Sequence, residues 1–192
     1  MGDYTVRDIL KMIIVLTIIG AVSGLVLSLV YEGTKAPIEY QTIKFVKEPA
    51  VKKVLTGYDN DPIADRKKIT IGEDEKGTPI DLIIFPAKKQ GTTFAVALEG
   101  KGKGFGGLIG VMVGVSKEGT LLDIGITSHS ETPGIGARVS ETFFTDRFKG
   151  LPTTQEVKVD GISGATYSSA GVRAAVTQAL GYVTQFSKEI FS

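Results

Sequence analysis

The chain has 192 residues, with 22 basic and 21 acidic side chains and a formal net charge of +1. This length suits one domain of ordinary size with an appendage, and the balanced charge argues against a nucleic-acid binder that works through a basic field. The chain has no cysteine and a single histidine, which excludes disulfides, cysteine-held zinc or iron–sulfur clusters and a histidine-rich metal site. Any redox chemistry must therefore come from a bound organic cofactor.

An uninterrupted apolar segment lies near the N-terminus. Met12–Tyr31 contains no charged residue, and as a helix it would be about 30 Å long, the thickness of the hydrocarbon core of a bilayer. A cleaved signal peptide has a shorter apolar core, of about 7–15 residues, followed by a small-residue cleavage site. The residues after Tyr31 do not form such a site. We therefore predict that residues 1–31 form a tail and a retained transmembrane anchor in the cell membrane.

The charges around this span do not decide its orientation. Arg7 and Lys11 precede it, but Lys35, Lys44 and Lys47 follow it, so the positive-inside rule favours neither side. A short tail before one span, with the rest of the chain after it, is a common signal-anchor layout. On that layout we expect a single-pass protein with its N-terminus in the cytoplasm and its domain on the extracytoplasmic side.

Residues 32–60 are predicted to connect the anchor to a folded domain of residues 61–192. Proline suits the first turn of a helix, so a helix is expected to start at Thr34–Pro37. Apolar residues then recur loosely to about Leu55, and residues 57–65 are rich in turn-forming residues.

From Lys68 the pattern changes to short apolar or alternating runs, which are typical of β-strands. A hairpin turn is expected at Ser116–Gly119. Phenylalanines at helical spacing predict a short helix over residues 140–148. The predicted strands cover residues 68–71, 80–85, 92–98, 108–115, 120–127 and 157–159.

The C-terminal segment has the clearest helical pattern of the domain. Apolar residues recur every three or four positions from Ser169 to Ile190, which predicts a long amphipathic helix. Ser168 or Ser169 is expected to cap its N-terminus. Strands followed by helices that cover one face indicate an α+β fold with an antiparallel sheet, after one N-terminal transmembrane helix.

Glycines crowd residues 100–107, which read Gly-Lys-Gly-Lys-Gly-Phe-Gly-Gly. Gly102, Gly104 and Gly107 have the spacing of a dinucleotide-binding fingerprint, but that fingerprint opens a helix and this one leads into a predicted strand. A P-loop is excluded because no Gly-Lys-Ser/Thr ends the segment. We interpret it as a flexible hairpin loop, whose glycines would also let a flat ring approach the backbone.

A second loop is expected at His129–Gly136, where glycine and proline are dense. His129 with Glu131 two residues later allows acid–base work. No nucleophile lies nearby in the sequence, so a structured turn whose polar groups satisfy one another is the stronger interpretation.

The third motif, Asp160–Ser169, reads Asp-Gly-Ile-Ser-Gly-Ala-Thr-Tyr-Ser-Ser and comes directly before the predicted helix. Four hydroxyl side chains lie within seven residues, whereas a helix cap needs only one. The start of a helix offers free backbone N–H groups and the positive end of the helix dipole. Such a place is a natural site for a phosphate group.

This third motif also resembles the recognition sequence for covalent flavinylation by a flavin transferase, at Asp160, Ser163, Gly164, Ala165 and Thr166. In that family the threonine carries FMN through a phosphoester bond, which implies Thr166 as the attachment point and Asp160 as part of the recognised sequence. The glycine-rich segment and the His129–Gly136 loop are similar to the flavin-binding domain of the same family, in the same order. The residues that the resemblance implies around the flavin are Ser163, Gly164, Ala165, Tyr167, Glu131, Thr132, Gly134, Gly104, Phe105, Gly106 and Gly107, with Tyr167 able to stack on the ring.

Together with the anchor, the resemblance covers essentially the whole chain and is to the family of Rnf ion-translocating oxidoreductase subunits that carry covalent FMN. It implies an electron carrier within an NAD–ferredoxin oxidoreductase that moves Na⁺ or H⁺, with other membrane subunits as partners, one of them carrying another flavin. Three alternatives remain at this point. They are the usually longer flavin-carrying relative in the sodium-pumping NADH:quinone reductase, a membrane-tethered flavin sensor without turnover, and an anchored scaffold whose motif is never modified.

Overall fold

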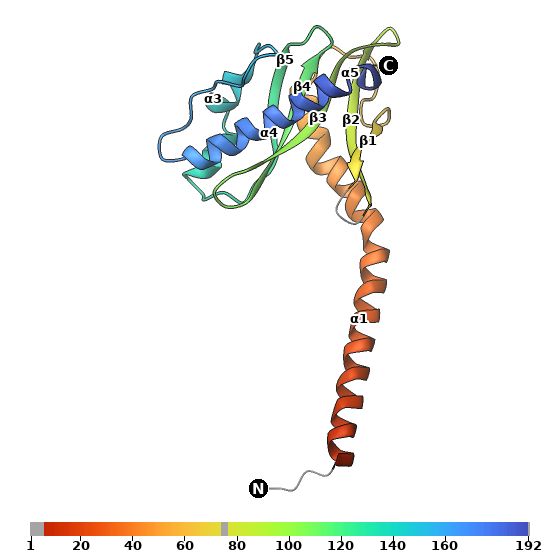
Figure 1. Ribbon diagram of the computed structural model, residues 1–192. Helices are drawn as coiled ribbons and strands as arrows, with labels where there is room; N and C mark the ends of the chain where they lie inside the picture. Colours follow the sequence, from red (N-terminus) through yellow and green to blue (C-terminus); the bar gives the residue numbers. More distant parts are fainter. Residues whose placement is uncertain (1–5, 74–76, 192) are drawn as a thin grey trace. The chain divides into compact units, whose positions relative to one another are not determined.

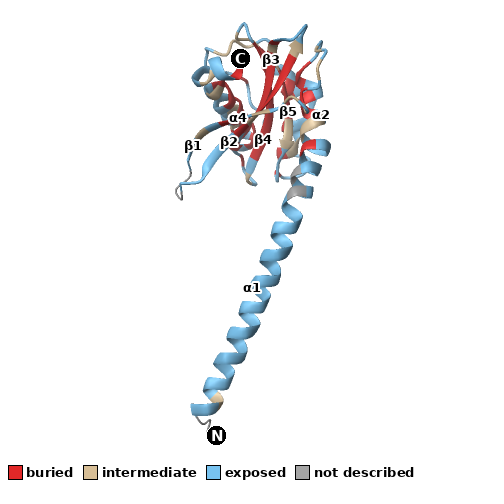
Figure 2. Ribbon diagram, turned by 90° about the vertical axis from the view of Figure 1, so that its right-hand side faces the viewer, coloured by how far each residue is buried: buried red, intermediate tan, exposed pale blue. Residues whose placement is uncertain are grey.

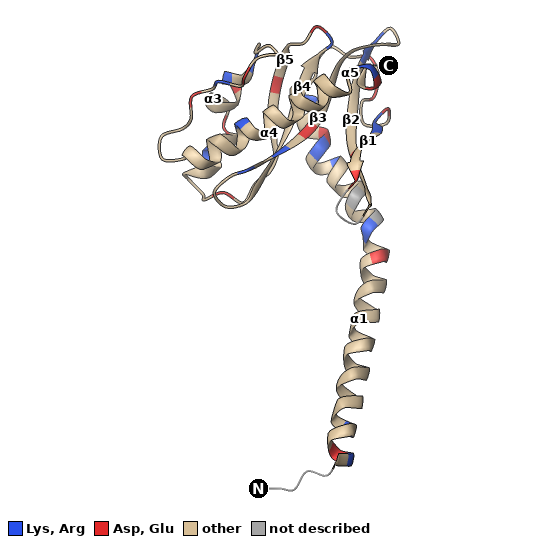
Figure 3. Cartoon of the chain, in the orientation of Figure 1, with Lys and Arg blue, Asp and Glu red and all other residues tan. Residues whose placement is uncertain are grey.

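The structure is a computed structural model that describes residues 6–73 and 77–191, and the chain divides into two units, Met1–Thr42 and Ile43–Ser192 (Figure 1). The first unit is the helix α1 (Val6–Thr42). Its apolar side chains are exposed (Figure 2), and its middle turns carry no charged residue (Figure 3). By length and composition, it belongs to the one helical stretch in the described part of the chain that could cross a membrane.

Pro37 lies inside α1, so the predicted helix start at Thr34–Pro37 is wrong. Proline removes one N–H donor from a helix interior, but the helix continues through this loss. It passes directly into the π-helical turn η1 (Ile43–Lys47) and the helix α2 (Glu48–Val54). The helical stretch ends before Leu55, close to the predicted end.

The second unit contains a sheet of five antiparallel strands whose spatial order follows the sequence. The strands are β1 (Lys67–Glu73), β2 (Pro79–Lys89), β3 (Thr92–Lys103), β4 (Leu108–Ser116) and β5 (Leu121–Ser128). The predicted strand at residues 157–159 does not form. There the Val159 carbonyl accepts a hydrogen bond from Arg173 (2.9 Å) in place of a ladder partner.

Helices pack on both faces of the sheet, so the expectation that they cover one face is wrong. On one face lies α4 (Thr166–Gln185), which buries Val172, Val176 and neighbouring residues against the strands (Figure 1). On the other face, α2 buries Val51 and Val54 against small and apolar strand residues, including Ala95 and Ala97. Alternating β3 residues point to the two faces, and its central residues Ala95–Leu98 are all buried, as expected for the middle strand of a three-layer arrangement.

A row of glycines explains how closely α4 approaches β3. A Cβ atom at Gly100 would lie 2.0 Å from the carbonyl oxygen of Ala175, and one at Gly102 would lie 2.0 Å from that of Gly171. Both distances are impossible for real atoms, so only glycine permits this contact. Residues 100–103 therefore belong to β3 and support the helix, and the predicted hairpin loop shrinks to Gly104–Gly107.

The segment between β5 and α4 contains only short helices, η2 (Gly136–Ser140), α3 (Thr142–Thr145) and η3 (Asp146–Phe148). The helix predicted over residues 140–148 is thus broken into two pieces, and Phe144 and Phe148 are buried with their rings 5.5 Å apart. A last turn, α5 (Ser187–Ile190), follows α4.

The long C-terminal helix begins at Thr166, three residues earlier than predicted, and its N-cap position is Ala165. No side chain caps it, so the expected capping by Ser168 or Ser169 is wrong. Both serines lie inside the first turn, and their hydroxyl groups bond to other segments. This places Thr166 in the helix and not in the preceding loop.

Candidate functional site

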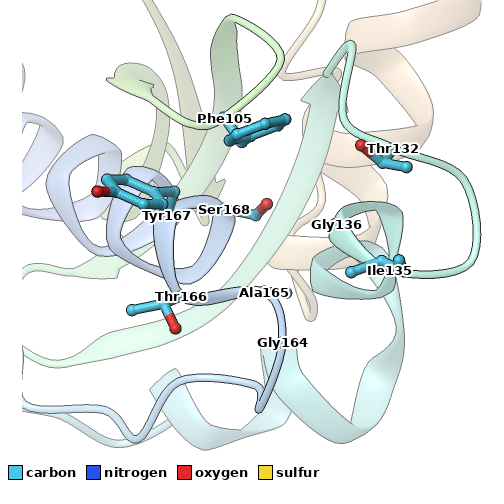
Figure 4. Close-up of a pocket in the computed structure, with 9 residues that line it drawn as sticks. All are labelled: Phe105, Thr132, Ile135, Gly136, Gly164, Ala165, Thr166, Tyr167 and Ser168. Atoms are coloured by element: carbon cyan, nitrogen blue, oxygen red, sulfur yellow. The ribbon is translucent and has the colours of Figure 1, made fainter.

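A cavity of about 360 Å³ lies where the three predicted motifs meet (Figure 4). Its volume is in the usual range for a small-molecule site, about 300–1,000 Å³. The start of α4 forms one side, the Gly104–Gly107 turn contributes Phe105, and the His129–Gly136 loop forms the opposite side. The lining residues are Phe105, Thr132, Ile135, Gly136, Gly164, Ala165, Thr166, Tyr167 and Ser168.

The structure therefore brings together residues from three segments that are far apart in the sequence. Six of the residues expected at the site line the cavity, namely Phe105, Thr132, Gly164, Ala165, Thr166 and Tyr167. The other expected residues belong to the same three segments without lining the cavity, namely Gly104, Gly106, Gly107, Glu131, Gly134, Ser163 and Asp160. The close packing of α4 on the β3 glycines sets the position of the start of α4 relative to the Gly104–Gly107 turn.

Thr166 is exposed and is the first residue of α4. The first helical hydrogen bond runs from the Ser169 N–H to the Ala165 carbonyl (2.9 Å). The amide groups of Thr166–Ser168 precede it, and such groups have no partner inside a helix. A tight turn delivers the chain to this point, with Gly164 at a φ of 80°, in the region that favours glycine.

The loop before Thr166 is held through its backbone. Arg147 donates to the Asp160 carbonyl (2.9 Å), and Arg173 donates to the carbonyl of the preceding residue, Val159 (2.9 Å). Ser169 Oγ accepts the Ile162 N–H (2.9 Å). The side chains of Asp160 and Ser163 stay exposed, so the loop has a fixed course and an accessible outer face.

Glu131 is a buried carboxylate beside the cavity, with 5% of its surface exposed. Its oxygens accept hydrogen bonds from the Phe105 N–H (3.1 Å), the Gly106 N–H (2.9 Å) and the Ser168 hydroxyl. Burial raises the pKa of Glu131, but these three hydrogen bonds outweigh burial and the pKa is lowered overall. His129 contributes in the same direction, and its Nδ1 accepts the Glu131 N–H (3.3 Å). Glu131 bonds to a side chain of its own loop through its N–H, whereas its carboxylate accepts donors from the other two motifs. The second loop is therefore more than a turn whose polar groups satisfy one another, because it joins the other two motifs.

Two aromatic rings flank the opening of the cavity. Phe105 is 74% exposed and Tyr167 is 71% exposed, and their ring centroids lie 6.4 Å apart (Figure 4). Exposed aromatic side chains at a concave site are well suited to a flat apolar ligand. Ile135, 53% exposed, faces the cavity from the other loop.

Comparison with known proteins gives a consistent result. The model of the FMN-binding domain family matches residues 104–181, which include the whole cavity. The G subunit of the ion-translocating oxidoreductase complex of Methanosarcina acetivorans is 32% identical over 186 residues, covering 93% of this chain and 96% of that protein. The chain belongs to this family of G subunits.

Other relatives extend this result. The G subunit of the proton-translocating ferredoxin:NAD(+) oxidoreductase complex of Clostridium ljungdahlii is 28% identical to the chain, and the match covers 90% of both proteins. Among solved structures, NqrC of Shewanella oneidensis has a TM-score of 0.53 at 22% identity, covering 78% of this chain and 76% of that one, which shows the same fold. The protein is a membrane flavoprotein subunit of an electron-transfer system, and FMN is its cofactor.

Three residues that line the cavity are not among those expected from the sequence, namely Ile135, Gly136 and Ser168. Ile135 and Gly136 lie in a loop whose importance is indicated by its glycine and proline density, but that density does not say which side chain faces inward. Ser168 stands near a helix start, where a serine is typically a cap. The helix begins three residues earlier than its apolar pattern indicates, and no local signal shows that the Ser168 partner is Glu131, 37 positions away.

Proposed function

We propose that this G subunit carries FMN covalently on Thr166, through a phosphoester bond to the threonine Oγ, and relays electrons between other subunits. The observation that carries the proposal is the position of Thr166. It is an exposed hydroxyl at the first residue of α4, and it lines the cavity. The free amide groups there favour a phosphate, and the cavity beside them can receive the ring.

Attachment requires an activated FMN donor, in which the phosphate already carries a leaving group. Thr166 Oγ forms a bond to phosphorus, the bond to the leaving group breaks, and the hydroxyl proton is released. The product is one FMN added with loss of the elements of water. A flavin transferase would recognise the exposed Asp160, Ser163 and the turn at Gly164–Ala165.

The residues around the cavity would then orient the cofactor. Phe105 and Tyr167 would pack against the ring from the side of α4, and Thr132 and Ile135 would face it from the other loop. Gly164 and Ala165, with no large side chain, leave room for the phosphate. When bound, FMN supplies reversible one- and two-electron chemistry, and the protein supplies orientation and burial.

We assign the wider setting from the relatives. The partners are the membrane subunits of an Rnf-type complex, including one with another flavin, and the complex couples NAD–ferredoxin electron transfer to Na⁺ or H⁺ movement. The FMN-binding domain is assigned to residues 61–192, after a tail and anchor at 1–31 and a connector at 32–60 that includes α2, which packs on the sheet. The domain lies on the extracytoplasmic side, which fits a tethered cofactor that cannot diffuse away.

Intact mass of the full chain, co-expressed with the transferase, tests the attachment. Two threonines line the cavity, which offers a matched pair of variants. We expect the wild type and Thr132→Val to gain one FMN, and Thr166→Val to gain none. Flavin fluorescence on a denaturing gel should follow the same pattern. An unmodified wild type under these conditions would overturn the covalent assignment.

Membrane side and electron transfer need separate measurements. Because the chain has no cysteine, single cysteines can be labelled cleanly with a membrane-impermeant maleimide. Ser140→Cys should react in intact cells and Gly2→Cys only after lysis, and the reverse pattern would place the domain in the cytoplasm. NADH–ferredoxin electron flux in membranes should be lost with Thr166→Val, whereas unchanged flux would favour a sensor.

A further inference from the structure

The Glu131 carboxylate joins the two segments that carry the exposed aromatic rings, the Gly104–Gly107 turn and the start of α4. On one side it accepts both N–H groups of Phe105 and Gly106, and on the other it accepts the hydroxyl of Ser168 in the first turn of α4. A carboxylate with several charge-assisted hydrogen bonds is among the stronger polar connections in a protein. One side chain therefore ties the Gly104–Gly107 turn to the start of the helix.

Glycines surround this carboxylate and leave the space that it fills. A Cβ atom at Gly104 would lie 2.5 Å from Glu131 Oε1, and one at Gly136 would lie 2.9 Å from Glu131 Cβ and 2.7 Å from Ser168 Oγ. Gly106 is equally restricted, because its Cβ would lie 2.0 Å from the Ser130 carbonyl oxygen. Glycines of two motifs therefore leave room for the buried carboxylate and its loop. None of these close contacts needs a ligand to explain it.

The groups that Glu131 holds are the neighbours of the two exposed aromatic rings. Phe105 is held by its own N–H, and Tyr167 precedes Ser168 directly. Because both rings are more than 70% exposed, packing of the side chains does little to fix them. Their spacing depends on the backbone, and the backbone on both sides is tied to the same carboxylate.

We propose that Glu131 is the positioning residue of the flavin site, holding Phe105 and Tyr167 at the spacing that receives the ring without contacting the ring itself. This inference rests on the proposed function for the identity of the ligand. Two observations argue against direct contact. Glu131 does not line the cavity, and its two oxygens already accept three donors.

Amide hydrogen exchange on the full chain without FMN tests the connection directly. We expect Glu131→Gln to raise exchange several-fold in two separate segments, residues 104–107 and 169–172, because the amide of glutamine turns a donor toward a site filled with donors. The second segment begins at Ser169, the first amide of α4 that has a helical partner. Exchange in β4 should not change. Val176→Ala, a buried α4 residue away from the carboxylate, is the control, since a merely destabilised domain would exchange faster throughout.

Ser168→Ala is the second variant, and it keeps the test valid if Glu131→Gln fails to fold. It removes only the connection to α4, so exchange should rise at residues 169–172 and change little at 104–107. If neither variant raises exchange at residues 169–172, or if Glu131→Gln raises it to the same degree in β4, the positioning role is wrong.

The FMN-loaded chain then gives the consequence for the cofactor. Glu131→Gln should carry FMN in full, since the recognised residues 160–166 are unchanged, but should lose most of the visible circular dichroism of the flavin and show a several-fold rise in iodide quenching. Wild-type spectra in that variant would contradict the inference. A wild type without FMN would instead contradict the covalent attachment, and the exchange experiment would still decide the role of Glu131.

Discussion

Two parts of the site, the proposed attachment segment and the pair of exposed aromatic residues, are held in opposite ways. The attachment segment, residues 159–166, is fixed through its backbone by Arg147, Arg173 and Ser169, and its own polar side chains stay exposed. The pair of aromatic residues, Phe105 and Tyr167, is instead positioned by the side chain of Glu131, which is buried and accepts backbone N–H groups.

This difference separates two tasks. A segment with a rigid course and exposed side chains suits recognition by another protein, which must read residues from outside. A buried carboxylate with exposed rings beside it suits the placement of a ligand. Attachment of FMN and its orientation should therefore be separable by mutation, although the attachment segment and Tyr167 meet within one turn of α4.

The strongest test compares Thr166→Val with Glu131→Gln. Thr166 is exposed, so its replacement should remove all FMN and leave the unfolding free energy within about 0.5 kcal/mol of wild type. Glu131→Gln should retain FMN and lose about 1–3 kcal/mol, because the buried network loses one acceptor oxygen and gains a donor in its place. Intact mass and urea unfolding of the full chain in detergent measure both quantities. Loss of FMN in both variants would show that attachment and orientation are one task.

Gly164→Ala tests the course of the attachment segment. Gly164 has a φ of 80°, and open space surrounds the position of its missing Cβ. An alanine would meet no clash but would strain the backbone by about 1–2 kcal/mol, so the turn should shift and FMN addition should slow about ten-fold. A time course of mass gain measures this. A normal rate would mean that the transferase does not depend on this turn.

The two arginines behind the same segment should have a smaller effect. Replacement of Arg173 or Arg147 by alanine removes one hydrogen bond to a carbonyl of this segment, about 1 kcal/mol, and should slow FMN addition about five-fold. Arg147→Ala also removes a hydrogen bond to the Phe143 carbonyl (3.2 Å). Arg138→Ala is the matched control, because its guanidinium, like that of Arg147, lies over the Phe143 ring (5.2 and 5.7 Å) but pairs with Glu141 instead of the attachment segment. Equal slowing in all three would point to surface charge and not to backbone support.

The fold is largely predictable because its signals are local. The apolar span, the alternating strands and the helical spacing near the C-terminus each arise from neighbouring residues, and the α+β class with one N-terminal apolar helix is confirmed. The wrong predictions concern residues whose local structure is decided by a contact with another part of the chain. The strand at 157–159 fails because Arg173 holds its backbone. The cap at Ser168 or Ser169 fails because the two hydroxyls bond Glu131 and Ile162.

The glycine-rich segment shows the same limit for the site. Its first glycines allow α4 to approach β3, and Gly104 and Gly106 leave room for a buried carboxylate and its loop. A sequence indicates that space is needed at these positions, but not what occupies it. The motif at 160–166 is recognisable because its residues are contiguous, whereas the role of Glu131 depends on residues 25 to 37 positions away.

The smallest expected effect is a dependence of stability on pH. The pKa of Glu131 is lowered in the folded chain from an ordinary value of 4.5, so its charged form favours the fold. That contribution is complete above about pH 4.5 and is lost as the pH falls through the folded pKa. Urea unfolding between pH 6 and 3 should therefore show a steeper loss of stability for wild type than for Glu131→Gln.

The comparison between wild type and Glu131→Gln isolates the contribution of the Glu131 carboxylate. Asp65 also has a lowered pKa, from its hydrogen bonds with Lys88 and Asn60, and it contributes equally to both curves. His129 Nδ1 accepts the Glu131 N–H, and His129→Gln in both backgrounds separates the share of this contact. Parallel curves for wild type and Glu131→Gln would mean that the carboxylate does not bind its proton more weakly in the fold, and the hydrogen bonds that hold Phe105 and Tyr167 apart would then contribute little.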